Sequence, residues 1–224
     1  MCFSASASFG AGVVLSVIGV ASVKKARTSK EVLFASIPLI FAIQQITEGF
    51  LWLALTKPAF AGLQSITTYL FLFFAQVVWP IWVPYSIFKL HKEEKYEVAQ
   101  KLLIVTGILV SVYLGYCLFT YHVEAKILGY HISYDQDYPS QLSRYGGILY
   151  VIATIVPPFI SGIKKMRLLG VSILISYIIT TIFYKDYIVS VWCFFSSLIS
   201  IIVLFIMHRI RTSDNTAAQA LSAN

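Results

Sequence analysis

Seven long apolar segments constrain this chain more than any other feature. They cover residues 5–23, 32–56, 66–88, 102–121, 146–162, 168–184 and 187–208. Each is close to the roughly 20 residues that a helix needs to cross the hydrocarbon of a bilayer. Hydrophobic residues make up 58% of the chain and charged residues 12%, about half the charged share of an ordinary soluble protein. We therefore expect an all-α, polytopic membrane protein, a bundle of seven transmembrane helices.

Basic residues near the segment ends predict the orientation of the bundle, because Lys and Arg are retained on the cytoplasmic side. One orientation leaves four outside, Lys57, Lys126, Arg144 and Lys185. The thirteen inside are Lys24, Lys25, Arg27, Lys30, Lys89, Lys92, Lys95, Lys101, Lys164, Lys165, Arg167, Arg209 and Arg211. The amino terminus is then expected outside and the carboxyl terminus inside. We expect residues 1–211 to form a single membrane domain and the polar residues 212–224 a disordered cytoplasmic tail.

The net charge of +7 does not require a nucleic-acid partner. Most of the basic residues fall in short loops, where membrane topology already explains them. Anionic lipid headgroups of the cytoplasmic leaflet are the expected neighbours. We therefore expect the lipid bilayer, and no nucleic acid, among the partners of this chain, while its sequence leaves the oligomeric state open.

Small residues recur every four positions along the first segment, at Ser4, Ser8, Gly12 and Ser16. This spacing places them on one helix face, where they allow a second helix to approach closely. The first segment is therefore expected to pack inside the bundle. Bends are expected where prolines free a backbone carbonyl, at Pro38, Pro80, Pro84, Pro157 and Pro158.

Glu48 is the one carboxylate that lies well inside an apolar segment, since the other nine Asp and Glu residues fall in loops, at segment ends or in the tail. A carboxylate in hydrocarbon costs about 3 kcal/mol or more unless it faces a polar interior, has a partner or binds a proton. In the predicted orientation Glu48 lies about 12 Å below the outer boundary. It therefore marks a candidate site in the outer half of the membrane.

Polar and indole side chains share the helix face of Glu48. Gln44, Gln45 and Trp52 lie four residues before, three before and four after it, which places all of them on one face. That face is expected to look inward. The third segment adds Gln76 and Trp79 near mid-membrane, so the sequence predicts an outward-opening ligand site made of Gln44, Gln45, Glu48, Trp52, Gln76 and Trp79.

Metal-ligating side chains are expected on the same outer side. Removal of the initiator methionine would make Cys2 the first residue, with an amine and a thiol that together chelate metal ions or act as a nucleophile. His122, His131 and Cys193 are expected near the outer boundary. Thiolate, imidazole and carboxylate ligands suit zinc or copper. A subset of these residues with Glu48 is therefore a candidate metal site, although no local ligand motif is present.

Several short motifs resemble a family of small bacterial multi-pass membrane proteins of unassigned function. They are Met1-Cys2-Phe3-Ser4-Ala5, Glu48-Gly49 followed by Trp52, Trp79-Pro80, Tyr121-His122 and Ser190-Val191-Trp192-Cys193-Phe194-Phe195. The likeness spans most of the chain, with a departure at Gln44-Gln45, where relatives often carry His-Gln. The resemblance implies a bacterial membrane, here the inner membrane, and a shared polar site, but no reaction.

Three classes of function fit these residues. The first is a metal site that serves binding, sensing or redox chemistry. The second is a carrier, channel or receptor in which Glu48 binds a proton, a cation or an amine. The third is an intramembrane hydrolase or acyltransferase with Cys2 as nucleophile and His122 or Glu48 as base. Enzymatic activity is left open, as are a purely structural role for Glu48 and a disulfide among Cys2, Cys117 and Cys193.

Overall fold

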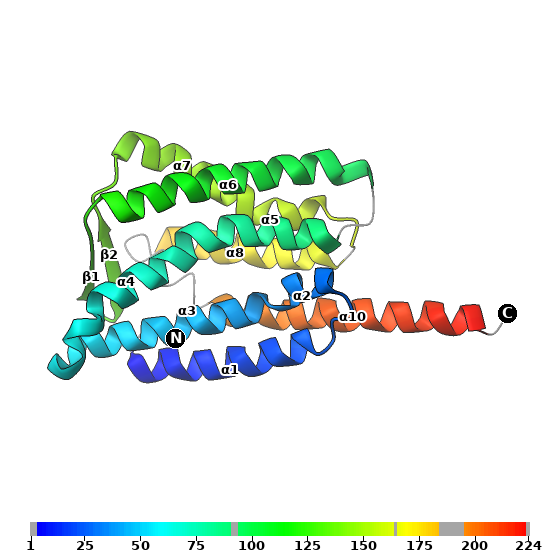
Figure 1. Ribbon diagram of the computed structural model, residues 1–224, viewed down its shortest axis with the longest axis horizontal. Helices are drawn as coiled ribbons and strands as arrows, with labels where there is room; N and C mark the ends of the chain where they lie inside the picture. The colour runs from blue at the N-terminus through cyan, green and yellow to red at the C-terminus, as the bar shows by residue number, and fades with distance from the viewer. Residues whose placement is uncertain (1–3, 91–93, 164, 184–194, 223–224) are drawn as a thin grey trace.

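The computed structural model describes residues 4–90, 94–163, 165–183 and 195–222 and is mostly helical. Most of its helices run along one long axis (Figure 1). They are α1 (Ala5–Val23), α2 (Ser29–Ala35), α3 (Ile37–Thr56), α4 (Gln64–Phe73), α5 (Trp79–Leu90), α6 (Glu97–Thr120), α7 (Ser140–Ile155), α8 (Met166–Phe183) and α10 (Ser196–Ser222). The largest apolar core lies where α3, α5, α8 and α10 converge, and it includes Phe41, Trp79, Leu169 and Val203.

Five helical segments in the described part of the chain are long and apolar enough to cross a membrane. They are Ala5–Val23, Ser29–Thr56, Pro58–Leu90, Glu97–Thr120 and Met166–Phe183. A shorter apolar stretch, Gly146–Ile160, matches the fifth predicted span in part. The seventh predicted span begins outside the described residues and ends within α10. A helical membrane protein is therefore supported, while the number seven and the orientation stay predictions.

A β-hairpin lies between the fourth and fifth predicted spans, in residues for which the sequence predicted no helix or strand. Strand β1 (Val123–Leu128) pairs antiparallel with β2 (His131–Gln136), with Leu128 opposite His131. The two-residue turn between them begins with Gly129 at φ 62°, whereas no residue other than glycine has positive φ in the described chain. Glycine in the first central position is typical of a type II′ hairpin turn. The all-α expectation therefore holds for the helical part of the chain, and this segment adds two strands that it did not include.

Helix breaks coincide with most of the prolines that predicted them. Pro38 stands at the start of α3, directly after the break from α2. Pro157 and Pro158 lie in a short 3₁₀ segment, Pro157–Ile160, at the end of α7. Pro80 follows a π-helical segment, Phe74–Val78, which joins α4 to α5. Pro84 lies inside α5 without ending that helix.

The π-helical segment leaves a carbonyl that another helix satisfies. The amide of Trp79 bonds to the Phe74 carbonyl, five residues earlier. The Ala75 carbonyl therefore lacks its usual partner, and Pro80, the next residue in line, has no N–H. The hydroxyl of Tyr150 on α7 donates to this carbonyl at 2.7 Å. This bond fixes the segment that carries Gln76 and Trp79 against α7.

Small residues bring α1 against α3. A Cβ added to Gly12 would lie 2.6 Å from Ile46 Cγ1, so the contact depends on glycine. Ser8 and Gly12 of the predicted ridge are buried, which confirms that this face packs against protein. The opposite face is exposed, with Val13 and Val17 63% and 66% accessible. α1 therefore lies at the edge of the bundle and not, as expected, inside it.

Helix α10 continues beyond the bundle. It extends to Ser222 and projects away from the other helices (Figure 1). It thus includes most of the residues predicted to form a disordered tail. A helix that packs against nothing has little to stabilise it beyond its own backbone hydrogen bonds. Disorder of residues 212–224 in solution therefore stays a prediction.

Candidate functional site

The polar face predicted on the second span lies inside the protein. Gln44, Gln45 and Glu48 of α3 are at most 1% exposed, and Trp52 is 6% exposed. α3 is surrounded by other helices, since α1, α4 and α10 all contact it. Glu48 is therefore removed from lipid and from bulk water.

Gln44 and Trp79 satisfy each other. The indole N–H of Trp79 donates to Gln44 Oε1 at 2.8 Å, and both residues are buried. The indole ring also stacks on Phe41 with centroids 4.0 Å apart. Paired in this way, Gln44 and Trp79 join α3 to α5, and the Gln44 carbonyl oxygen and the Trp79 N–H are already used within the protein.

Gln45 and Glu48 form a second pair, and here a buried acceptor and a neighbouring buried donor are left without hydrogen bonds to the described residues. Gln45 Nε2 donates to Glu48 Oε2 at 3.3 Å. Within the described part of the chain, Gln45 Oε1 and Trp52 Nε1 are buried and accept or donate no hydrogen bond. A buried polar atom without a partner costs about 1–3 kcal/mol. An acceptor and a donor with unused capacity therefore share the helix face of the Glu48 carboxylate.

The β-hairpin packs against the end of α3 that follows Glu48. Leu51 and Trp52 contact Ala125 and Ile132 in one apolar cluster. Trp52 is one helical turn beyond Glu48, so the hairpin lies over the end of the helix that the sequence assigned to the outer face. Figure 1 shows the hairpin at this end of the bundle, beside α4.

Gln76 belongs to the hairpin contact and does not contact the Gln44–Trp79 pair through any described hydrogen bond. Gln76 Nε2 donates to Gln136 Oε1 at 2.8 Å, and the Tyr138 hydroxyl donates to Gln76 Oε1 at 3.0 Å. Both polar atoms of the Gln76 amide are therefore used. The Tyr138 hydroxyl is protonated at neutral pH, and burial raises its pKa further above the ordinary value.

The predicted metal ligands are not assembled by the described residues. No group of three or more His, Cys, Asp or Glu side chains suited to a metal occurs among them. His122 is exposed, with Nε2 4.0 Å from Glu124 Oε2. His131 begins β2, and burial lowers its pKa. Cys2 and Cys193 lie outside the described residues, so the metal hypothesis stays a prediction.

The remaining cysteine, Cys117, is buried in α6 as a free thiol.

Charged side chains on the hairpin form an exposed cluster. Lys126 Nζ lies 3.0 Å from Glu124 Oε2 and 3.2 Å from Asp135 Oδ2. All three side chains are 43–57% exposed. The hydrogen bond that Lys126 donates to Glu124, and next the one that it donates to Asp135, raises the pKa of Lys126. The hairpin therefore holds one lysine between two acidic side chains at its surface.

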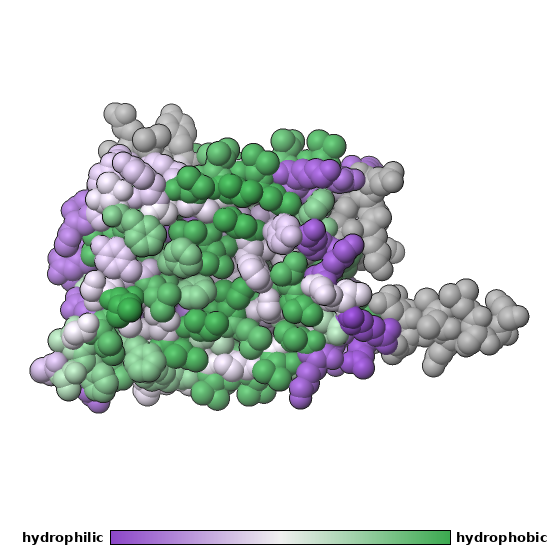
Figure 2. Space-filling view, in the orientation of Figure 1, coloured by the Kyte–Doolittle hydropathy of each residue, from purple (hydrophilic) through white to green (hydrophobic). Residues whose placement is uncertain are grey.

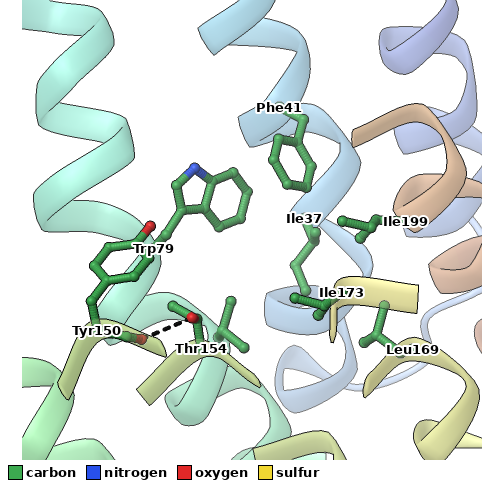
Figure 3. A pocket seen from close by; sticks show the side chains of 9 residues that line it. Ile37, Phe41, Trp79, Tyr150, Thr154, Leu169, Ile173 and Ile199 are labelled. Carbon is green, nitrogen blue, oxygen red and sulfur yellow. Dashed lines mark hydrogen bonds between the residues drawn. The ribbon is translucent and has the colours of Figure 1, made fainter. Parts of the chain in front are cut away.

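A small apolar cavity lies beside the Trp79 ring, between α3, α5, α7, α8 and α10. Its volume is about 30 Å³, more than the roughly 10–15 Å³ that one water needs. Figure 3 shows Phe41 and Trp79 on one side and Ile173, Leu169 and Ile199 on the other. The Thr154 hydroxyl donates to the Tyr150 carbonyl at 2.8 Å. The cavity offers no charged group and is not the site of a polar ligand.

The sequence missed Gln136 and Tyr138, the partners of Gln76. Their segment was left between the predicted spans because it is polar: it contains three of the chain's ten carboxylates, Glu124, Asp135 and Asp137, and two histidines. A signal was present: two six-residue strands flank Gly129-Tyr130, the spacing of a two-residue hairpin. The contact with Gln76, about sixty residues earlier, has no local signal.

Comparison with known proteins adds family membership but no activity. A family model described as a family of unknown function, DUF6629, matches residues 1–219. No curated protein and no solved structure matches the chain. The family match agrees with the resemblance inferred from the sequence motifs and extends over both the buried face of α3 and the hairpin.

Proposed function

The chain belongs to the family of unknown function DUF6629, and we propose that it is a multi-pass membrane protein that binds a metal cation at Glu48. The observation that carries this proposal is the Gln45–Glu48 pair. Gln45 gives its amide N–H to the carboxylate at 3.3 Å, and its carbonyl oxygen has no partner among the described residues. Carboxylate and amide oxygens are both cation ligands.

The other predicted ligand residues have narrower roles in this proposal. Gln44 and Trp79 bond to each other, and Gln76 bonds to the hairpin. The first pair holds α5 against α3, and Gln76 holds the hairpin against the π-helical segment that precedes α5. Trp52 retains a role at the site, because its N–H can donate to a water on the bound ion or its ring face can attract the cation.

Additional ligands would determine which ion binds. With oxygen ligands alone the site favours a hard cation, whereas thiolates from Cys2 or Cys193 would shift its preference towards zinc or copper. The hairpin covers the expected route to Glu48, so ions would enter beside Trp52. The carrier and the Cys2-dependent hydrolase stay alternatives without a supporting contact among the described residues.

We also propose the topology predicted from the sequence, with seven spans, the amino terminus outside and the carboxyl terminus inside a bacterial inner membrane. The stretch Gly146–Ile160 and the first part of α10 supply the two spans beyond the five long segments. In that topology the hairpin and the Glu48 end of α3 face outward. Reporter fusions after Lys57 and after Arg211 test it, since they are expected on opposite sides.

Metal binding is tested with the full-length protein in detergent, purified without chelators. Metal content is measured by mass spectrometry, and affinity by titration with zinc, copper, magnesium and calcium. Glu48→Gln is expected to lower the affinity at least about tenfold, because the loss of a charged partner costs about 1.5–3 kcal/mol. Glu124→Gln is the matched control, since it removes an exposed carboxylate.

Two further variants define the ligand set. Gln45→Leu removes the carbonyl oxygen and is expected to weaken binding by a smaller factor than Glu48→Gln. Cys2→Ser weakens zinc and copper binding only if the thiol is a ligand. Equal metal content and affinity in the native protein, Glu48→Gln and Gln45→Leu would contradict the proposal.

A further inference from the structure

Exposed cations gather at the end of the bundle opposite the hairpin, where α1, α2 and α10 meet (Figure 1). Lys24, Lys30, Arg209 and Arg211 are all exposed there. Figure 2 shows hydrophilic side chains at this end, directly beside a hydrophobic surface. The site at Glu48 does not use any of these residues.

A hydrogen bond fixes Arg211 beside the end of α1. Arg211 Nη1 donates to the Lys24 carbonyl at 3.2 Å, which joins α10 to the C-cap residue of α1. This bond uses one of the five N–H donors of the guanidinium. The remaining donors keep the planar arrangement that matches a phosphate group. Arg211 and Lys24 are therefore held together with donors to spare.

The cluster has little counter-charge from the described protein. The lysines in ion pairs between described residues are Lys101 and Lys126, both in other regions. Among the side chains that the structure describes at this junction, Glu31 is the acidic one, and its Oε2 accepts the Arg27 backbone N–H at 2.8 Å. Asp214, one turn beyond Arg211 in the sequence, adds at most one further carboxylate. The cations therefore outnumber the acidic side chains, and the cluster favours an external anion.

An apolar stripe leads from the membrane interior to Lys24. Val13, Val17 and Val20 follow one another at four- and three-residue steps, and Lys24 continues the same face four residues later. The three valines are 63%, 66% and 48% exposed. The stripe spans about 16 Å from Val13 to Lys24, close to half of the roughly 30 Å hydrocarbon thickness. One leaflet of lipid has this depth.

We propose that this junction binds an anionic glycerophospholipid, with the phosphodiester on Lys24 and Arg211 and an acyl chain along the valine stripe. Lys30 and Arg209 add positive charge around the headgroup. Arg209 lies 5.2 Å from the Phe205 ring, which holds its side chain on the α10 side. A bound lipid would clamp α10 against α1 at the point where α10 leaves the bundle.

Native mass spectrometry of the full-length protein in detergent tests the proposal. Phosphatidylglycerol and phosphatidylcholine are titrated separately, and bound lipid is counted. We expect phosphatidylglycerol to bind more tightly. The double variant Lys24→Gln/Arg211→Gln is expected to lower the affinity for phosphatidylglycerol about 30-fold, because each basic residue near a lipid surface raises the affinity about fivefold.

Controls separate a lipid site from general charge and from free phosphate. Lys57→Gln/Lys101→Gln removes the same charge elsewhere and should leave the lipid affinity within about twofold. Inorganic phosphate should not displace the lipid, and Val17→Asn should weaken lipid binding without altering phosphate binding. If the double variant does not fold, Lys24→Gln and Arg211→Lys are measured singly, with about a fivefold loss expected for Lys24→Gln.

Three results would overturn the proposal: equal binding of the two lipids, an equal loss in the control pair, or full displacement by inorganic phosphate.

Discussion

Two regions near the hairpin end of the protein hold carboxylates in opposite environments. Glu48 lies fully buried in α3 beside an amide, whereas Glu124 and Asp135 lie exposed on the hairpin and share Lys126. Exposed ion pairs contribute little to stability. A carboxylate kept inside an apolar helix costs free energy and therefore points to a role other than stability. The hairpin charges suit a solvated surface, and Glu48 suits a binding site.

The largest effect is expected at Glu48 itself. In metal-free buffer, Glu48→Gln is expected to raise the free energy of unfolding by about 1–3 kcal/mol, because it removes a buried charge and keeps the side-chain shape. Thermal or denaturant unfolding in detergent measures this. Glu124→Gln serves as control. A clear loss of stability in Glu48→Gln would instead favour a structural role for the carboxylate.

Gln44→Leu is expected to destabilise the protein by about 1–3 kcal/mol, since Trp79 Nε1 would lose its buried acceptor. Combining it with Trp79→Phe removes both polar partners and should cost less than the sum of the single changes. Unfolding of the two single variants and the double variant gives the coupling. Additive losses would show that the 2.8 Å bond does not join α3 to α5.

Gln76→Leu is expected to loosen the hairpin by about 1–2 kcal/mol, because it removes both hydrogen bonds to Gln136 and Tyr138. Hydrogen exchange of the amides in β1 and β2 measures this local opening. Thr106→Val on α6 is the control, since that hydroxyl bonds within its own helix. Unchanged exchange in Gln76→Leu would contradict the assigned contact.

His131 makes hairpin stability depend on pH. Its pKa is lowered by burial in the folded protein, so the unfolded state binds the proton more readily. Stability from this group is complete above the ordinary pKa of about 6.5 and falls as pH drops below it towards the folded value. His131→Gln should flatten the profile in that range, measured by hydrogen exchange of the hairpin between about pH 7 and 5.

Lys126→Gln is expected to have the smallest effect, because Lys126 is exposed with both of its partners. Any change in melting temperature should shrink as salt is added. Melting curves at low and high ionic strength measure this. A large loss of melting temperature that does not depend on salt would contradict the contrast between the exposed hairpin charges and the buried Glu48.

The sequence predicted the helices better than the contacts between them. The first span was predicted at residues 5–23, the bounds of α1, because apolar runs of membrane length are a local signal. The shared face of Gln45, Glu48 and Trp52 followed from helical spacing. The pairing of Gln44 with Trp79 did not follow from the sequence, because it depends on the relative rotation of α3 and α5. The pairing of Gln76 with Tyr138 did not follow either, because it depends on the hairpin, whose charged residues are typical of a loop.

The most direct test is whether a metal ion changes the chemical state of Glu48. Infrared difference spectra of the reconstituted protein, taken with and without the ion, report the carboxyl group. We expect the ion to shift the carboxylate bands or to convert a protonated carboxyl into a carboxylate, and Glu48→Gln to abolish that signal while Glu124→Gln keeps it. A spectrum without a carboxyl signal, or one that Glu48→Gln leaves unchanged, would contradict a cation site at Glu48.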